Sequence, residues 1–519
     1  MDSKEAIKVA LIVFFALFLR LFRLSEVPVG FHGDEASVGY NAYSLLKTAR
    51  DQNGNFLPLA IDQFGDFRPA GYHYIAIPFI ATFGLSELAV RLPAALVGGL
   101  SVIPFYLLIL QLLNKQKIAL IGSLLFAISP WHIALSRATS ESIIALFLVL
   151  YGTYFLLRKK LSYSFLAFLL SFVFYHAARL FVPFLIVGYI FLLKPKSFTR
   201  FAMLIIFSSI FIFFASNGFG RAGQVSILKA PGEMQELRQQ QSEDEGYTPW
   251  TVRALHNKAT FYIATVARNY SEHFTPSFLF LEGGQPVRYK VPWTGVMYLT
   301  DIAFVFIALL VNEKILYLTI LWLLLGPLPA AFTFGELPSV QRAVFMIPPL
   351  LILCAYGLDK VLKKKTIVII FLLLIYGYQG TIFLHNYFQH SFTHEPWYRN
   401  AAEKELVFDV DRLVKEGKKI IMTSQNDNNL IFYLFYLRFD PKQFQEMGSP
   451  RDKDNLVFGN ITFTYKHCPL EGSEDDPALG EAGAIYVNRG ECKTPKNSDL
   501  LKDIQWPDRS VAFRILRLK

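Results

Sequence analysis

The chain alternates long apolar runs with short clusters of basic residues. The apolar runs are about 16 to 20 residues long and lack amphipathic spacing, which is typical of membrane-spanning helices. The first run, Val9 to Leu24, follows Lys4 and Lys8, but no small-residue cleavage site follows it. We therefore interpret it as an uncleaved first span with a cytoplasmic N-terminus. The pattern predicts a polytopic α-helical membrane protein.

The basic clusters predict the topology, because lysine and arginine concentrate in cytoplasmic connections. The segments 118–157 and 161–193 each have basic residues at both ends, so we expect each to cross the membrane twice. The runs in 161–193 are short for a hydrocarbon layer of about 30 Å, which favours burial among other helices or local thinning. About eleven spans and an external C-terminus follow. We expect the spans near 7–24, 91–112, 118–134, 140–157, 161–176, 180–193, 201–216, 293–311, 315–334, 343–361 and 366–384.

The same topology predicts two domains. Residues 1–384 form a transmembrane domain with long outer loops at 25–90 and 217–292, and residues 385–519 form a small extracytoplasmic α/β domain. The expected elements of the second domain are helices over 397–416 and 428–439, and strands over 419–423 and near 456–465, 484–488 and 511–518. Cys468 and Cys492 lie on the oxidising side, as a disulfide or as two free thiols.

Composition and charge support the membrane interpretation. Apolar residues make up 53% of the chain and charged residues only 18%, against about 25% in soluble domains. The net charge of +10 lies mostly in the short clusters, where it sets orientation, so no nucleic-acid partner is predicted. Three cysteines cannot supply a four-ligand zinc site.

Two adjacent carboxylates, Asp34 and Glu35, come directly after the first span. Adjacent side chains on a helix point about 100° apart, so we expect only one of them to face a given pocket. Gly33 and the helix-like run to Lys47 place Asp34 near a helix N-terminus, where an anion is stabilised. Asp34 is therefore a candidate for chemistry, with a simple N-cap as the alternative role.

Three motifs follow one another in the first outer loop: Asp34-Glu35, Arg68-Pro69-Ala70, and the run from Glu87 to Arg91-Leu92-Pro93. Their order resembles the dolichyl-phosphate-mannose protein mannosyltransferase family and its bacterial relatives, such as the lipid A aminoarabinose transferase. The second motif departs from the family pattern, because Arg68 replaces the commoner Lys and Ala70 the second Pro. The resemblance covers about residues 7–360 and is strongest over 20–145. Further matches are Ser129 to Arg137 with Glu141, and Pro338 to Arg342.

The resemblance implies a GT-C type fold and an inverting glycosyltransferase. Such an enzyme moves a sugar from a polyprenyl-phosphate donor to an acceptor on the extracytoplasmic face of the cell membrane. The implied partners are the donor, membrane lipids and an acceptor that is a lipid, a protein or a glycan. Asp34 would be the general base, with Glu35 as the second catalytic candidate. Arginines at the outer helix ends would neutralise the departing phosphate.

The remaining candidate residues bind substrate, and each has a structural alternative. Arg68 and Arg342 are the candidates for the donor phosphate. Arg137 is a third candidate, although it could instead bond turn carbonyls. The spacing of Glu87 and Arg91 favours a structural ion pair. Two further substrate-binding candidates are Tyr72 and His73, and tyrosines at this height also occur in an interfacial aromatic belt.

Two questions stay open. Three scattered histidines, His32, His73 and His132, could gather a divalent ion with the two carboxylates, but no spacing requires one, so we predict neither a metal nor another cofactor. A multi-span transporter of a lipid-linked or small polar substrate is the alternative function. A transporter would place ionisable residues near mid-membrane, whereas the polar motifs here stand at one face.

Overall fold

The computed structural model divides the chain into two compact units, which we describe separately. The helical unit comprises Met1–Phe22, Asp66–Gly71 and Ala94–Leu384, and the α/β unit comprises Arg23–Gly65, Tyr72–Pro93 and His385–Lys519. These units differ from the predicted domains, because most of the first outer loop groups with the C-terminal residues. The structure describes residues 3–193, 198–215, 226–227, 233–244, 248–311, 313, 316–362, 366–424, 429–451, 453–471 and 480–519.

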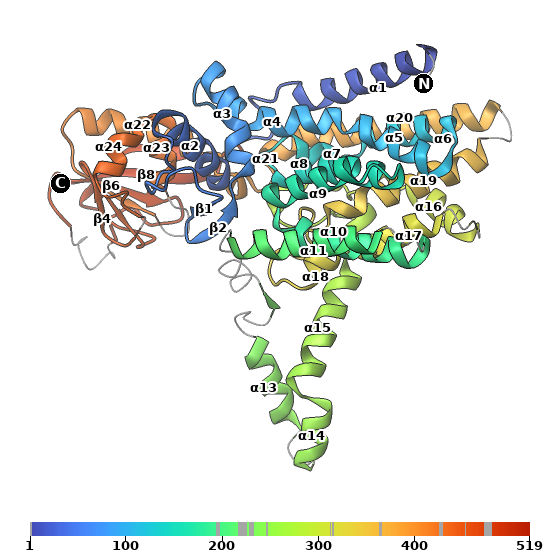
Figure 1. The fold of residues 1–519 in the computed structure, drawn as a ribbon. Helices are drawn as coiled ribbons and strands as arrows, with labels where there is room; N and C mark the ends of the chain where they lie inside the picture. The colour runs from blue at the N-terminus through green and yellow to red at the C-terminus, as the bar shows by residue number, and fades with distance from the viewer. Residues whose placement is uncertain are drawn as a thin grey trace. The chain divides into compact units, whose positions relative to one another are not determined.

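Apolar helices build the helical unit, and each predicted span overlaps a helix or consecutive helices, although the span expected over 293–311 is helical only from Asp301 (Figure 1). They are α1 (Ser3–Leu21), α4 (Glu87–Leu100), α5 (Val102–Leu113), α6 (Gln116–Ile128), α7 (Pro130–Ser136), α8 (Glu141–Leu157), α9 (Leu161–Phe174), α10 (His176–Leu193), α11 (Phe198–Ala215), α16 (Asp301–Leu310), α17 (Tyr317–Leu325), α18 (Leu328–Ala331), α19 (Ile347–Val361) and α20 (Thr366–His385). Of these, α4 begins in the α/β unit. The strand β2 (Asp66–Pro69) also belongs to the helical unit.

Length and composition allow only some of these helices to cross a bilayer alone. Within the described residues, Glu87–Leu113, Val344–Val361 and Thr366–Thr393 are long and apolar enough, and the pair α6–α7, bent by 52°, makes a fourth if it forms one span. Six further apolar helices are 10–17 residues long. The helical character of the apolar runs is thus confirmed, whereas the number of eleven spans and their topology stay a prediction.

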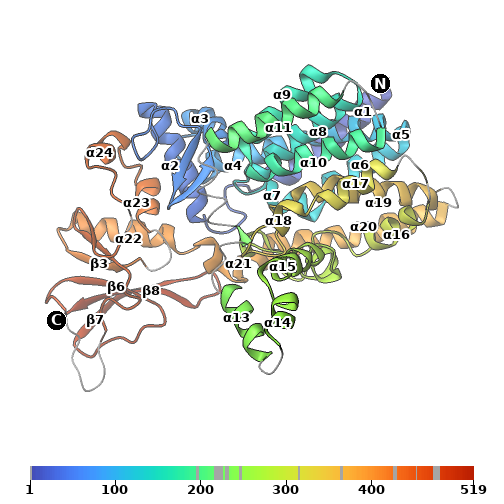
Figure 2. The same cartoon turned by 60° about the horizontal axis from the view of Figure 1, so that its bottom comes forward.

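Close helix packing compensates for the shortness of some helices. In Figure 2, α8, α9, α10 and α11 lie side by side, and each pair of neighbours is in contact. Gly152 on α8 permits the approach of α9, because a Cβ there would lie 2.5 Å from the Phe168 ring. The hydroxyl of Ser164 on α9 also donates to the Gly152 carbonyl at 2.8 Å. Neighbouring helices thus bury apolar faces that a short span alone would leave to the lipid.

The segment 217–292 contains its own helices, which extend away from the rest of the helical unit (Figures 1 and 2). They are α13 (Glu233–Glu243), α14 (Pro249–Leu255) and α15 (Lys258–Glu272), followed by a π-helical turn over Ser277–Leu281 and a 3-10 turn over Val287–Tyr289. Asn257 caps α15 by accepting hydrogen bonds from the backbone of Ala259 and Thr260.

The α/β unit is built on a six-stranded mixed sheet in the order β4-β5-β3-β6-β8-β7. Only β3 is parallel to both of its neighbours, β5 and β6. The strands are β3 (Ile420–Thr423), β4 (Leu456–Phe458), β5 (Ile461–Thr464), β6 (Ile485–Arg489), β7 (Ser498–Gln505) and β8 (Val511–Leu518). The helices are α2 (Gly33–Thr48), α3 (Gly71–Phe83), α22 (Glu403–Lys415), α23 (Leu430–Tyr436) and α24 (Pro441–Glu446), and the short strand β1 spans Ala60–Gln63. The predicted α/β class is confirmed, and β7 is an additional strand.

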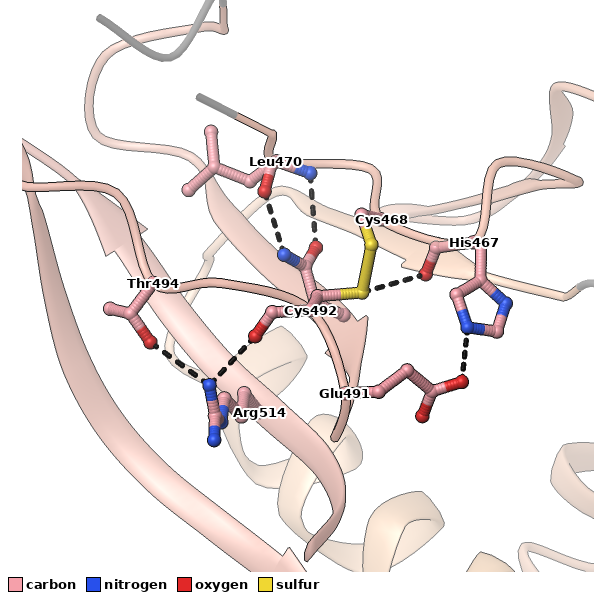
Figure 3. The surroundings of a disulfide bond; sticks show 8 residues. His467, Cys468, Leu470, Glu491, Cys492, Thr494 and Arg514 are labelled. Carbon is pink, nitrogen blue, oxygen red and sulfur yellow. Dashed lines mark hydrogen bonds and ion pairs between the residues drawn. A yellow bond between two sulfur atoms is a disulfide. The ribbon is translucent and has the colours of Figure 1, made fainter. Parts of the chain in front are cut away.

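Cys468 and Cys492 form a disulfide, which decides between the two predicted alternatives (Figure 3). Around it, the Asn488 side chain holds the backbone of Leu470 through hydrogen bonds of 3.0 and 2.7 Å. Arg514 donates to the carbonyl of Cys492 at 2.7 Å. Closing a loop of 24 residues stabilises the folded state by about 3 kcal/mol in the chain-entropy model.

Glu403, at the start of α22, is fully buried, and its two carboxylate oxygens have no hydrogen-bond partner among the described residues. Burial raises the pKa of Glu403 to about 7, against a smaller opposing effect of Arg489. An exposed glutamate has a pKa of about 4.3, so the folded state keeps a proton that the unfolded chain loses. The free energy of unfolding should therefore fall as pH rises from about 4.3 to about 7, by about 4 kcal/mol in total.

The substitution Glu403→Gln should remove this pH dependence. Urea unfolding of the full chain should show the variant more stable than the wild type at pH 8 and about equal to it at pH 4. The neighbouring Glu405→Gln is the control, because Glu405 pairs with Lys502 on the surface. Equal pH dependence in wild type and Glu403→Gln would contradict the prediction.

Candidate active site

The N-terminus of α2 carries both predicted catalytic carboxylates. His32 is the N-cap, and its side chain accepts a hydrogen bond from the Asp34 backbone at 3.1 Å. The Glu35 carboxylate accepts from the backbone N–H of His32 at 3.4 Å, which completes a capping box. The predicted helix start is confirmed. The alternative role of Asp34 as N-cap is wrong, because His32 occupies that position.

Glu35 is committed to an ion pair with Arg91. Nε of Arg91 lies 3.2 Å from Oε1 and Nη2 lies 2.9 Å from Oε2, and the side chains of Arg91 and Glu35 are only 1% and 9% exposed. The same guanidinium donates to the carbonyls of Pro28 and Gly30 at 3.1 and 2.6 Å. A bidentate buried pair of this kind holds the chain before α2 in place. These contacts favour a positioning role for Glu35, whose catalytic role stays a prediction.

The expected ion pair between Glu87 and Arg91 is wrong. Instead, the Glu87 carboxylate accepts from Lys404 at 3.1 Å and from the Tyr436 hydroxyl at 3.0 Å. Spacing of four residues favours pairing on an exposed helix face. Arg91 is buried, and it therefore takes the partner that the fold brings to it from α2.

Asp34 differs from its neighbour in exposure. Its side chain is 20% exposed, and its Oδ2 lies 3.7 Å from Nδ1 of His32. The positive end of the α2 dipole stabilises the carboxylate there. Asp34 thus combines a fixed backbone with a carboxylate that solvent, and hence a substrate, can reach.

Tyr72 and His73 occupy the first turn of α3 and are fully buried. The Tyr72 hydroxyl donates to the Val90 carbonyl at 2.9 Å. Nε2 of His73 accepts from the Gln63 amide at 2.8 Å. These contacts favour packing roles, and substrate binding by either side chain stays a prediction.

Arg68 lies on β2 in the helical unit, near the turn between α9 and α10. Nε of Arg68 donates to Asp66 at 3.2 Å, and the side chain is partly exposed. The segment is held by His176, whose Nε2 donates to the Phe67 carbonyl at 3.2 Å and whose Nδ1 accepts from Arg179 at 3.0 Å. This places a second guanidinium in the turn that holds the Arg68 strand.

Arg342 and Arg288 share one carboxylate at another point of the helical unit. Arg342 lies 3.4 Å and Arg288 lies 3.9 Å from Glu336, and Arg342 also donates to Thr333 and to the Gly335 carbonyl at 3.0 and 2.8 Å. Two guanidinium groups therefore contact the same carboxylate. Arg288 was not a predicted site residue. Only its contact with Glu336 distinguishes it from other basic residues, and that contact is formed by the fold.

A buried histidine supports this arginine pair. Nε2 of His273 accepts from the Ser339 backbone at 2.9 Å, and Nδ1 donates to the Asn269 carbonyl at 2.8 Å. Burial, with a smaller contribution from Arg342, lowers the pKa of His273 to about 4, against the opposing hydrogen bond to the Asn269 backbone. The neutral ring therefore keeps one donor and one acceptor at neutral pH, which fixes the loop that carries Arg342.

Arg137 directly follows α7, and its buried side chain contacts the C-terminal end of α1. Its guanidinium donates to the carbonyls of Leu19, Arg20 and Phe22 at 2.8, 3.0 and 2.8 Å. Such carbonyls have no partner within the helix. These contacts correspond to the structural alternative for Arg137, and its role in substrate binding stays a prediction.

The candidates therefore fall into two sets. Asp34, Glu35, Tyr72 and His73 belong to the α/β unit, whereas Arg68, Arg137 and Arg342 belong to the helical unit. Among the residues that the structure describes, no group of three or more His, Cys, Asp or Glu side chains gathers into a metal-binding cluster.

Residues 10–178 match the family model of the dolichyl-phosphate-mannose-protein mannosyltransferases. This match identifies the chain as a glycosyltransferase. It includes all three motifs of the first loop, and the predicted resemblance to the family is confirmed. The chain matches no curated protein in sequence.

Solved structures show that this glycosyltransferase shares its fold with known membrane enzymes. It aligns with ArnT from Cupriavidus metallidurans in the apo state with a TM-score of 0.53 and 10% identity, over 99% of this chain and 98% of ArnT. The same protein bound to undecaprenyl phosphate gives a TM-score of 0.53 and 11% identity, with the same coverage. The chain also aligns with the oligosaccharyltransferase AglB from Archaeoglobus fulgidus, in complex with an inhibitory peptide and a dolichol-phosphate. This alignment has a TM-score of 0.50 and 12% identity over 84% of this chain. The chain spans 64% of the length of AglB. The predicted GT-C type fold is thereby supported.

Proposed function

We propose that this glycosyltransferase moves a sugar from a polyprenyl-phosphate donor to an acceptor on the extracytoplasmic face, with Asp34 as the general base. The observation that carries the proposal is the position of Asp34. It is a partly exposed carboxylate at a helix N-terminus, within the part of the chain that matches the family model, beside a Glu35 that is held by Arg91.

The reaction is a single displacement that inverts the anomeric centre. The acceptor oxygen attacks the anomeric carbon opposite the phosphate and passes its proton to the Asp34 carboxylate. The glycosidic bond forms as the bond from carbon to phosphate oxygen breaks, and the bonding electrons leave with the polyprenyl phosphate. Arginine side chains stabilise the charge that develops on this leaving group.

Arg68 and Arg342 are the proposed ligands of the donor phosphate. Both are partly exposed arginines. Arg179 is linked to the Arg68 strand through His176, and Arg288 shares the Glu336 carboxylate with Arg342. The bound undecaprenyl phosphate of ArnT and the dolichol-phosphate of AglB support a lipid phosphate as the donor group. The acceptor would be a lipid, a protein or a glycan.

Replacing Arg68 by alanine should weaken donor binding by ten- to a hundredfold, because a hydrogen bond to a charged group is worth about 1.5–3 kcal/mol. Mass spectrometry of the purified protein should detect a co-purified polyprenyl-phosphate sugar, in a smaller amount in the variant. Arg268→Ala, on the exposed face of α15, is the control. Equal donor occupancy in the wild type and in both arginine variants, Arg68→Ala and Arg342→Ala, would remove these residues from the site.

The proposed sidedness puts the loop 25–90 outside and the connection after α8 inside. We expect an impermeant thiol reagent to label Leu59→Cys in intact cells and to label Arg158→Cys only after lysis. Leu59 is 61% exposed and Arg158 is exposed, so both sites are reachable. The background is low because Cys354 is buried and the other two cysteines form a disulfide. The reverse labelling pattern would exclude the eleven-span topology.

A further inference from the structure

The α/β unit contains an open cavity of about 340 Å³ between the first outer loop and the C-terminal residues. This volume falls in the range of roughly 300–1,000 Å³ that is usual for small-ligand sites. The cavity is separate from Asp34. It is lined by Gln52 and Asn53, beyond the C-terminal end of α2, whereas Asp34 is at the start of that helix. At 1.5 Å per residue, the helix places about 20 Å between them.

The floor of the cavity is apolar. It is formed by Leu430, Ile431 and Leu434 of α23 and by Phe444 of α24, all of which are buried. An apolar floor excludes water from one side of a ligand, and the contribution to affinity grows with the apolar area covered.

The polar residues of the lining, here called the rim, are nearly neutral in sum. Asp62 and Arg451 form an ion pair of 2.6 Å there, so each charge is met by the other. Two carboxamides, those of Gln52 and Asn53, supply further donors and acceptors. Oε1 of Gln52 is buried without a hydrogen-bond partner among the described residues. A buried acceptor of this kind costs free energy unless a ligand or water donates to it.

Two of the side chains that line the cavity are exposed aromatic rings. Phe64, at the tip of the turn after β1, is 40% exposed, and Tyr465, after β5, is 46% exposed. The face of an aromatic ring carries partial negative charge, and it attracts C–H groups that are polarised by neighbouring oxygens. Exposed rings beside carboxamides therefore offer both kinds of contact that a sugar ring makes.

We propose that this cavity is a binding site for a neutral carbohydrate. Two linked sugar rings place their C–H faces on Phe64 and Tyr465, one on each, and each hydroxyl can both donate to and accept from the rim. A phosphate is disfavoured because Asp62 already compensates Arg451. An acyl chain is disfavoured because it would leave the rim groups without partners. The assignment of this sugar as part of a glycan acceptor rests on the proposed function, whereas its binding does not.

Binding can be measured on the full-length protein in phospholipid nanodiscs, since detergents with sugar headgroups would compete. Saturation-transfer NMR with mannobiose, cellobiose and chitobiose should show transfer to at least one disaccharide, and titration should give its Kd. Phe64→Ala and Tyr465→Ala should each weaken that binding about tenfold, because each removes one stacking surface. Phe56→Ala is the matched control, since Phe56 lies in the same loop, is 64% exposed and does not line the cavity.

Gln52→Leu separates a ligand contact from a structural one. Its Oε1 has no hydrogen-bond partner in the described part of the chain, so the variant should keep the thermal stability of the wild type and yet bind the disaccharide several-fold more weakly. The proposal would be overturned if none of the three disaccharides binds, or if all variants bind with the same Kd. It would also be overturned if an uncharged tetrapeptide, measured as a control ligand, binds more tightly than the disaccharides.

The two proposals can fail independently. Disaccharide binding that survives in a protein without transferase activity would support the cavity and refute the proposed reaction. The KM for the acceptor could instead be the same in the wild type and in Phe64→Ala, Tyr465→Ala and Gln52→Leu. That result would refute the role of the cavity in acceptor binding, and the proposed reaction would still hold.

Discussion

Replacing Asp34 by asparagine is expected to lower sugar transfer by at least about a hundredfold, since general base catalysis contributes about 10²- to 10⁴-fold. Asparagine keeps the shape of the side chain and can still accept a hydrogen bond, but it cannot take a proton at neutral pH. The start of α2 should be retained, because His32 and Glu35 make its capping hydrogen bonds.

The measurement is transfer of sugar from the donor lipid by purified protein, together with donor binding and thermal stability. Asp411→Asn is a matched control, because Asp411 is also a helical aspartate with a side chain 20% exposed, paired with Lys415 on the surface. Near-normal transfer by Asp34→Asn, with donor binding and stability intact, would exclude Asp34 as the base. If the variant is instead largely unfolded, and the folded fraction keeps normal transfer, Asp34 has a structural role.

Local signals in the sequence predicted the secondary structure well. Apolar runs bounded by basic residues give the positions of the helices, because a helix that faces lipid or other helices must be apolar along its whole length. The start of α2 was predictable from Gly33 and the carboxylates after it. The strand β7 was missed because polar residues interrupt the apolar ones in its sequence, SDLLKDIQ, and because its position at the edge of the sheet leaves even Leu500 and Leu501 exposed.

Contacts between distant segments were less predictable. The pairing of Arg91 with Glu35 joins residues 56 positions apart, and nothing in the spacing distinguishes it from the local pair with Glu87. The grouping of the first outer loop with the C-terminal residues, and the cavity that both of them line, likewise depend on tertiary packing. The three motifs of the first loop gave the family because their order along the chain is itself a signal, but the partners of each side chain came only from the fold.

The largest effect on stability should come from Arg91→Leu. This substitution leaves the Glu35 carboxylate buried without its cation and removes the donors to the carbonyls of Pro28 and Gly30. Removal of one partner of a buried ion pair typically costs about 3–5 kcal/mol, because the remaining charge is desolvated and unpaired. Urea unfolding of the full chain, with proteolytic cleavage within the α/β unit as the readout, should show the free energy of unfolding reduced by this amount.

Two variants test the cause of that loss. Lys404→Ala removes the partner of Glu87, and because Lys404 is 58% exposed the cost should be about 0–1 kcal/mol. Adding Glu35→Gln to the Arg91→Leu protein removes the unpaired charge and should recover part of the lost stability, whereas Glu35→Gln alone should be destabilising. If the double variant is no more stable than Arg91→Leu, the loss comes from the carbonyl contacts or from packing, and the ion pair is not what holds the chain segment before α2.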